Sequence, residues 1–216
     1  MAKSGTTGAV ARSIREGTRQ RIVEAAVQTI KERGFTATSA RAIAATGGFN
    51  QALVFYHFGS VNDLLLAALD RTSQARMTRY RAAIASVGTL PELLAVAGET
   101  YKEDLAGGHI KVLAEMIAGA SATPELKPEI SARLQPWVTF TEEVVVKVMA
   151  RSPLAQLVPS RDLAFAIVAL YLGVAMLTHL ADDPAPAESL FLTGSRVGAL
   201  LHGKRLVDPG PDTAVD

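Results

Sequence analysis

The sequence predicts an all-α protein, with an N-terminal three-helix unit followed by a C-terminal helical bundle, about nine helices in total. Apolar residues recur at helical spacing, as in Ile22, Ala26 and Ile30, which lie four residues apart on one helix face. No segment shows the alternation of a strand, and no Asn-Gly or Asp-Gly pair marks a hairpin turn. The chain has 216 residues, 49% of them hydrophobic, so it is long enough to bury a substantial core.

The first elements are a basic arm and a long helix. Residues 1–14 are small, polar and basic, and we expect them to form a disordered arm. The helix that follows covers about 16–33, because its apolar face continues to that point and Gly34 supplies a C-terminal stop. Thr38 or Ser39 can then cap a short second helix, since hydroxyl oxygens accept hydrogen bonds from the free amides of a first turn.

A glycine-containing turn separates the second helix from the third. Gly47 and Gly48 give the backbone freedom that a tight turn requires. Asn50 is placed to cap a brief third helix that ends at Phe58, and Val54 and Phe58 are expected to face the core. Two short helices joined by such a turn, and braced by a longer first helix, predict a helix-turn-helix unit.

The rest of the chain predicts a bundle of longer helices. Ser60 starts the first of them, with Asp63 three residues later as a variant of the capping box, and Thr89 caps another. The expected helices cover about 60–86, 89–106, 109–121, 127–150, 161–181 and 186–202. The remaining tail contains proline and aspartate and is expected to be flexible.

The formal net charge of +1 conceals an asymmetry along the chain. Residues 1–81 contain 12 Lys and Arg against 5 Asp and Glu, whereas residues 82–216 contain 10 against 16. A basic first part indicates a polyanionic partner, either nucleic acid or a membrane surface, and the acidic second part indicates a separate role. A solvated basic face without a partner is the alternative.

The segment LAFAIVALYLGVAMLTHL, residues 163–180, has no formal charge over nearly the length of a membrane span. It lacks flanking basic clusters and a full aromatic belt, so we expect no membrane span. A helix that is apolar on every side is instead buried in a core or a subunit interface. Ala169 and Gly173 would let another helix approach closely, and we expect a homodimer through helices 161–181 and 186–202.

Catalytic and metal-binding motifs do not stand out. The chain has no cysteine, which excludes disulfides, thiolate metal sites and thiol catalysis and fits a reducing compartment. It has neither a GxSxG nucleophile elbow nor a GxxxxGK[ST] phosphate loop. Glu142 and Glu143 diverge by about 100° on a helix and cannot act as a facing acid–base pair. We therefore expect no enzyme activity, no cofactor and no metal.

The stretch GGFNQALVFYHFGS, residues 47–60, gathers three rings and a histidine on the third helix. In a helix-turn-helix unit this helix presents its N-terminal residues to base edges in the major groove. Gln51 suits a base edge or a phosphate, while Tyr56 and His57 offer a hydroxyl and an imidazole N–H to phosphates. Packing against the first helix is the alternative for these two rings.

These features occur in a recognisable order. The run GFTATSARAIAATGGFNQALVFYHFGSVNDLL resembles the DNA-binding region of the tetracycline-repressor (TetR) family of bacterial regulators, and the resemblance covers about 19–69. The rest of the chain matches that family only in helical character and length. The resemblance implies a regulator in which a divergent C-terminal domain holds a small-molecule effector.

The resemblance also implies which residues meet DNA. It places Thr38 and Arg41 near phosphate on the second helix. Asn50 stands where the family usually has a capping Ser and caps equally well. On the groove-facing helix the resemblance places Asn50, Gln51, Ala52, Phe55, Tyr56 and His57.

Two further positions depart from the family pattern. Phe55 stands where the family usually has Tyr, and Val61 where it commonly has Lys, so one hydroxyl and one charge contact are missing. Each lost phosphate contact should weaken binding to all sequences and flatten its salt dependence. The basic arm, with Lys3, Arg12 and Arg15, is a candidate to offset the loss in a minor groove.

The expected effector pocket is mostly apolar with a few polar groups. Ring-bearing and apolar residues of the C-terminal domain are its candidates, and plain core is the alternative for each of them. These candidates are Tyr101, Met116, Trp137, Phe140, Phe165, Tyr171 and His179.

These points predict a sequence-specific DNA-binding transcriptional regulator, a repressor released from its double-stranded DNA operator by a small apolar ligand. The N-terminus lacks the apolar stretch of a secretory signal, so a cytoplasmic location is expected. The alternative is a small-molecule-binding helical protein or enzyme whose C-terminal pocket acts without DNA. The predicted domains are an arm at 1–14, a helix-turn-helix domain at 15–60, an effector-binding and dimerisation domain at 61–203 and a tail at 204–216.

Overall fold

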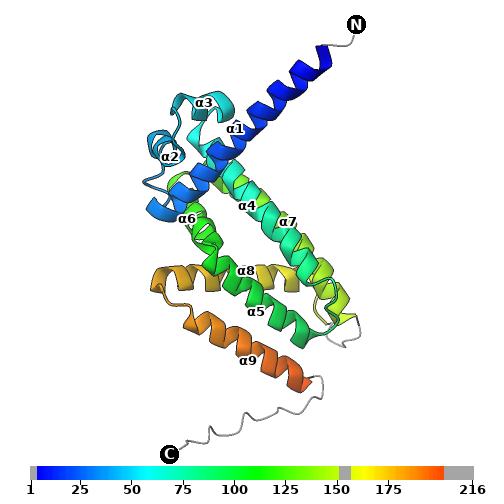
Figure 1. Cartoon of the computed structure of the whole chain (residues 1–216). Coiled ribbons are helices and arrows are strands. Elements are labelled where there is room, and N and C mark those ends of the chain that lie inside the picture. Colours follow the sequence, from blue (N-terminus) through cyan, green and yellow to red (C-terminus); the bar gives the residue numbers. More distant parts are fainter. Residues whose placement is uncertain (1–3, 151–156, 202–216) are drawn as a thin grey trace, which may run out of the picture.

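The computed structural model describes residues 4–150 and 157–201, and within them the chain forms nine helices and no strand. The all-α prediction is therefore confirmed. The helices are α1 (Ser4–Arg33), α2 (Ala40–Gly47), α3 (Ala52–Phe58), α4 (Val61–Ala83), α5 (Leu90–Ala106), α6 (His109–Ala122), α7 (Leu126–Met149), α8 (Ser160–Ala181) and α9 (Ala185–Leu201). In Figure 1, α1 to α3 form one end of the molecule, α4 and α7 run along its length, and α8 and α9 lie at the other end.

Side-chain caps begin several of these helices at the predicted residues. The Ser39 hydroxyl accepts a hydrogen bond from the N–H of Ala42 at 3.2 Å, and the Ser60 hydroxyl accepts one from the N–H of Asp63 at 3.0 Å. Thr89 forms a reciprocal capping box with the residue three positions later. Each cap satisfies an amide that has no partner inside the helix and is worth about 1 kcal/mol.

The third helix is capped by Asn50, as predicted. Gln51 already has helical backbone angles, φ −56° and ψ −25°, although α3 is assigned from Ala52. The Asn50 side chain accepts a hydrogen bond from the Ala52 N–H at 2.9 Å. Before it, Gly48 ends α2 in the left-handed region, with φ 65°, which residues with a Cβ adopt at a cost.

The predicted disordered arm is corrected by the structure over residues 4–14, because α1 already begins at Ser4. The segment has glycines and threonines, which are weak helix formers, but it contains no proline, so nothing in the backbone prevents the helix from extending through it. Figure 1 shows this first part of α1 projecting away from the other helices. Residues 1–3 and the predicted tail at 204–216 lie outside the described residues.

One hydrophobic core joins the helix-turn-helix unit to the larger domain. Ile22, Ile43 and Val54 contribute to it from α1, α2 and α3, and each is fully buried. Leu64 of α4 and Met116 of α6 belong to the same cluster and are equally buried. Truncating such a side chain to alanine costs about 2–5 kcal/mol, so the two parts of the chain stabilise each other.

Helix α8 is long and apolar enough to cross a membrane by length and composition alone, and the bent pair of α3 and α4 passes the same test. In the single chain, α8 is buried on one side only, so a core position within one chain does not account for its apolar composition. Ala164, Ala175 and Thr178 face the protein interior. Phe165 and Leu177, by contrast, are 66% and 68% exposed. Such an uncovered apolar stripe is typical of a surface that binds a partner.

Candidate nucleic-acid interface and ligand cavity

The third helix presents one exposed face and one buried face. Gln51 and Ala52 are exposed at its start, and Phe55 and Tyr56 are 51% and 69% exposed one turn later. Val54 between them is fully buried in the core. Side chains at these spacings lie on the same side of a helix, so α3 carries two rings and an amide on a single outer face.

A hollow beside α3 extends this face onto α2. It is lined by Arg41 of α2, Gly48 of the turn, and Asn50 and Gln51 at the start of α3. Arg41 is exposed, so its guanidinium is available to an anion. His57 is half-buried, and its ring contacts that of Tyr56 edge-on, with centroids 5.0 Å apart.

Two arginines of α1 lie against the rings of α3. The guanidinium of Arg15 lies 5.7 Å from the Tyr56 ring centroid, and that of Arg19 lies 4.6 Å from the Phe58 centroid. Both arginines are exposed. Arg15 was predicted as a minor-groove candidate of the basic arm, whereas Arg19 was not singled out from the sequence. Their positions add positive charge at the edge of the α3 face, which suits a phosphate backbone.

Thr38 does not belong to this exposed face. Its side chain is 8% exposed, and its hydroxyl donates a hydrogen bond to the Gly34 carbonyl at 2.6 Å. The hydroxyl thus closes the turn after α1. Sequence alone could not separate Thr38 from its neighbour Ser39, which caps α2, because both positions suit a cap.

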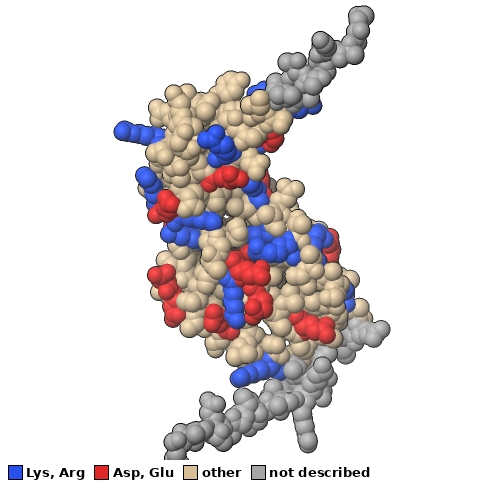
Figure 2. Space-filling model, in the orientation of Figure 1, with Lys and Arg blue, Asp and Glu red and all other residues tan. Residues whose placement is uncertain are grey.

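Charges are distributed unevenly over the surface. Figure 2 shows acidic side chains mostly over the lower half of the molecule, where they mix with basic ones, while the end formed by α1 to α3 has few. On the face shown, the charge asymmetry of the sequence is therefore also an asymmetry of the surface. It favours contact of the α1–α3 end with a polyanion.

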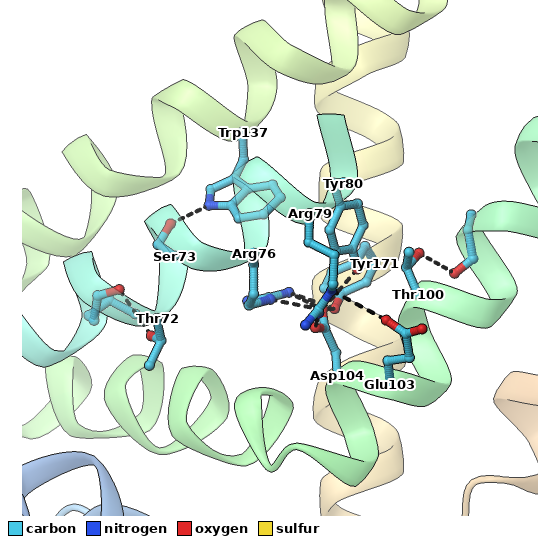
Figure 3. Close-up of polar contacts among 12 residues, drawn as sticks. Thr72, Ser73, Arg76, Arg79, Tyr80, Thr100, Glu103, Asp104, Trp137 and Tyr171 are labelled. Atoms are coloured by element: carbon cyan, nitrogen blue, oxygen red, sulfur yellow. Dashed lines mark hydrogen bonds and ion pairs between the residues drawn. The ribbon is translucent and has the colours of Figure 1, made fainter. Parts of the chain in front are cut away.

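A cavity of about 380 Å³ lies in the larger domain, between α4, α5, α7, α8 and α9, and Leu113 of α6 also lines it. Its size is within the range of small-molecule sites, and aliphatic side chains make up most of its wall. Trp137, Phe140 and Tyr171, which were predicted to line a pocket, are in this wall. Figure 3 shows Tyr171 within a group of polar residues that includes Arg76 and Asp104, and Trp137 to one side of that group.

The other four predicted ligand residues do not line the cavity. Tyr101 is fully buried and donates its hydroxyl to the Thr178 hydroxyl at 2.8 Å. Met116 is fully buried in the shared core. Phe165 is 66% exposed on the outer side of α8. A ring on a helix faces a cavity only if the helix has the right rotation about its axis, which composition does not specify.

His179, the fourth of these residues, lies beside an acidic group on α6. Its Nε2 is 3.4 Å from Oε1 of Glu115. The prediction of a pocket ligand is therefore replaced by a contact between α8 and α6. Within the part of the chain that is described, no three His, Cys, Asp or Glu residues are grouped as a metal ion would require.

Sequence reasoning missed the main polar feature of the cavity, which is a buried cluster around Asp104. Asp104 of α5 is fully buried, and Arg76 of α4 donates to its Oδ2 from Nε at 2.8 Å. Arg79 donates to the other carboxylate oxygen, and Tyr80 donates its hydroxyl to Oδ2 at 2.8 Å. Figure 3 shows these side chains converging on one point. Breaking such a buried ion pair on one side costs about 3–5 kcal/mol.

Tyr171 connects this cluster to α8. Its hydroxyl lies 2.8 Å from Nη2 of Arg76, which donates to it, and 3.2 Å from Oδ2 of Asp104. Burial raises the pKa of Tyr171 well above its ordinary value, and burial also raises the pKa of Tyr80. Burial opposes the charge of Arg76, but Tyr171 and Asp104 outweigh it and the net pKa is raised. The cluster therefore combines neutral phenols with a charged arginine at neutral pH.

Residues 22–68, from the second half of α1 to the start of α4, match the family of bacterial regulatory proteins named tetR. The regulatory protein TetR from Rhodobacter sphaeroides is similar in fold, with a TM-score of 0.70 and 17% identity over 82% of this chain and 96% of that one. No curated protein matches the chain.

Two further solved structures have the same fold. The fatty acid degradation regulator FadR from Bacillus halodurans has a TM-score of 0.69 at 19% identity, over 83% of this chain and 93% of that one. The transcriptional regulator FadR from Bacillus subtilis, solved in complex with stearoyl-CoA, has a TM-score of 0.67 at 18% identity, over 86% and 99%. The helix-turn-helix region therefore matches the tetR family of bacterial regulatory proteins, and the chain as a whole has the fold of these solved regulators.

Proposed function

We propose that this protein is a ligand-responsive transcriptional regulator that binds operator DNA through α3 and leaves it when a small molecule occupies the cavity. One observation carries the proposal. The helix-turn-helix unit exposes Gln51, Phe55 and Tyr56 on one face of α3, where rings would otherwise be buried. Large exposed rings beside polar groups are typical of binding surfaces.

The DNA contacts divide between the groove and the backbone. Gln51, at the start of α3, is the candidate for a base edge, because the N-terminal residues of a recognition helix reach deepest. The Tyr56 hydroxyl and the guanidinium groups of Arg15, Arg19 and Arg41 are candidates for phosphates. The two arginines from α1 also replace, in part, the contacts that Phe55 and Val61 lack.

A homodimer through α8 and α9 supplies the second recognition helix. Proteins of this family act as dimers, and the exposed face of α8 offers a suitable surface in this chain. Leu170, Leu177 and Leu180 are 59%, 68% and 76% exposed on it. Gly173 is exposed among them, and a Cβ there would meet nothing within 4 Å in the single chain. A partner helix can therefore pack closely at this position. Coverage by a second copy accounts for the apolar α8 without a membrane.

Helix α4 connects the ligand to the DNA. It starts at the turn after α3 and carries Arg76 and Tyr80 into the cavity wall. A ligand that prefers one arrangement of α4 relative to α5 and α8 shifts the population of dimers toward it. Release follows if that arrangement misplaces the two α3 helices for successive major grooves. We propose repression as the outcome, a cytoplasmic location, and binding without catalysis.

Fluorescence anisotropy with labelled DNA from upstream of the gene tests this function. We expect specific binding at moderate salt that weakens steeply as salt is raised, because phosphate contacts release counterions. Random DNA of equal length is the control. Equal affinity for both DNAs at every salt concentration would contradict sequence-specific binding. It would favour the alternative, in which the pocket acts without DNA.

A further inference from the structure

We infer that the cavity takes an apolar molecule whose one polar group is an oxygen acceptor, a carboxylate or a carbonyl, held by Arg76. The inference rests on the proposed function only in treating the cavity as a ligand site. It adds the chemical class of the ligand, and it excludes a cationic one.

The charged residues of the cavity wall are all basic. Arg76 and Arg133 are among the lining residues, and none of the lining residues described is Asp or Glu. The nearest buried carboxylate, Asp104, lies behind the wall and is already surrounded by Arg76, Arg79 and Tyr80. A cationic group that enters the cavity therefore loses its water and finds no free anion.

One nitrogen of the Arg76 guanidinium, Nη1, is available to a ligand. The residue is 6% exposed, its Nε donates to Asp104, and its Nη2 lies 2.8 Å from the Tyr171 hydroxyl and 2.7 Å from Asp104 Oδ2. No described residue accepts from Nη1. Among the described residues, two side-chain atoms are fully buried without a hydrogen-bond partner, Arg79 Nε and His109 Nδ1. Arg76 Nη1 has no partner either but is not one of these fully buried atoms, so it is accessible. Because Arg76 lines the cavity, Nη1 is an available donor there.

The guanidinium is also held in a fixed position. Its central carbon lies 5.1 Å from the centroid of the Trp137 ring and 5.9 Å from that of Tyr171. Stacking on these rings and the bonds to Asp104 leave the side chain little freedom. A donor that is already oriented binds an acceptor with a smaller loss of entropy.

Arg133, the other arginine in the wall, is already paired. Its Nε and Nη2 donate to the two carboxylate oxygens of Asp70, at 2.7 and 3.0 Å, and its Nη1 donates to Glu129 at 2.9 Å. These partners are exposed, so Arg133 is drawn toward the surface. It provides a matched control for Arg76, because it lines the same cavity with its nitrogens occupied.

The rest of the cavity wall favours a ligand whose apolar part is elongated. Along α4 the lining runs from Leu69 to Ile84, and along α7 it runs from Ile130 to Val145. Each of these stretches is about 22 Å long at the helical rise of 1.5 Å per residue. Arg76 lies near the middle of the α4 stretch, so an acceptor bound there leaves apolar wall on both sides.

Isothermal titration of the full chain without DNA tests the inference. The probes are decanoic acid, methyl decanoate and decylamine, which share a chain and differ in the polar group. We expect the acid, the ester or both to bind at least tenfold more tightly than the amine, which is protonated at pH 7. Tighter binding of the acid identifies a carboxylate ligand, and equal binding of acid and ester identifies a carbonyl. Amine binding within tenfold of the better oxygen probe, or no binding of either, overturns the inference.

Two variants test the role of Arg76 itself. Arg76→Gln alone leaves Asp104 short of a partner in the interior, so the double variant Arg76→Gln/Asp104→Asn is the better test, with its fold checked by circular dichroism. We expect it to lose at least tenfold in affinity for the better oxygen probe, while Arg133→Gln stays within threefold of the wild type. If the double variant keeps the preference, or the control loses it equally, Arg76 does not hold the head group.

Binding and release are separate outcomes. A probe that binds as expected but leaves the DNA complex intact contradicts ligand-driven release and leaves the ligand class standing. A cationic molecule that binds and releases DNA contradicts the ligand class and leaves the proposed function standing.

Discussion

The carboxylate of Glu115 on α6 accepts a hydrogen bond at 2.6 Å from the backbone N–H of Phe35, in the loop that joins α1 to α2. A second contact lies nearby, where Lys31 of α1 donates to the Gly107 carbonyl at 2.5 Å. Both contacts cross from the helix-turn-helix unit to the larger domain. Because Leu113, two residues before Glu115, lines the cavity, α6 offers a short route from a bound ligand to the DNA-binding unit.

Removing the Glu115 carboxylate should weaken this connection. Glu115→Ala leaves the Phe35 N–H without its acceptor, which costs about 1–3 kcal/mol for a buried group. We expect lower stability in urea and a smaller ligand-induced loss of DNA affinity. Glu115→Gln keeps an oxygen acceptor and is the control. If Glu115→Ala retains the full ligand response in anisotropy, the signal does not pass through this contact.

The packing of Phe35 on α6 should be equally sensitive. A Cβ at Gly119 would lie 2.4 Å from the Phe35 ring, so Gly119→Ala forces the ring or the helix to move. We expect a loss of about 1–3 kcal/mol in unfolding free energy, as in other overpacked sites. Gly17→Ala is the matched control, because a Cβ there meets nothing within 4 Å and alanine favours the helix by about 1 kcal/mol. A stabilising Gly119→Ala would contradict the close approach.

The α8 face should determine the oligomeric state. Gly173→Arg places a long charged side chain in the middle of the apolar stripe, at an exposed position where an added Cβ would meet nothing within 4 Å in the single chain. We expect the dimer to dissociate while the helical content is unchanged, because a buried unpaired charge is strongly unfavourable at an interface. Gly88→Arg, in the loop before α5, also has open space and should remain dimeric. Size-exclusion chromatography with light scattering measures both, and a dimeric Gly173→Arg would exclude this face.

The free energy of unfolding should decrease in mild acid, because the unfolded chain binds a proton at His109 more readily than the folded chain does. Its Nδ1 is buried without a hydrogen-bond partner among the described residues, and burial lowers the pKa of the ring. Lys31, Arg76 and Arg79 add to this effect, and Asp104 opposes it. In the unfolded chain the pKa of a histidine is about 6.5. Between the two pKa values the unfolded chain binds more protons, so the unfolding free energy decreases as pH falls below about 6.5.

His109→Asn should flatten this pH dependence. Urea unfolding at a series of pH values and one fixed protein concentration measures it, since dimers unfold with concentration-dependent midpoints. Equal slopes for the variant and the wild type between pH 7 and pH 5 would assign the effect to other groups.

Local signals made the helix boundaries predictable. Ser39, Asn50, Ser60 and Thr89 cap helices where the sequence placed them, because a cap depends only on residues within one turn. The helical start of α1 was missed because its composition resembles that of a mobile arm. The order of motifs around the third helix likewise predicted the resemblance to the tetR family, which the match over residues 22–68 confirms for that region.

The ligand site was less predictable because it depends on contacts between distant segments. Arg76 and Asp104 belong to different helices, and nothing in their local sequence marks either as buried. Trp137 and Tyr171 reach the cavity while Met116 and Tyr101 do not, although all four lie on apolar helix faces. Helix rotation and the choice of neighbouring helix decide this, and neither is encoded by spacing alone.

The affinity of Gln51→Ala for operator DNA tests most directly whether α3 reads the sequence. A lost base contact costs about 1–3 kcal/mol per site and should reduce specific binding while binding to random DNA is unchanged. Gln135→Ala, on α7, is the matched control. Anisotropy at fixed salt should show a loss of specificity for Gln51→Ala alone. Unchanged discrimination between operator and random DNA in that variant would contradict the assignment of α3 as the recognition helix.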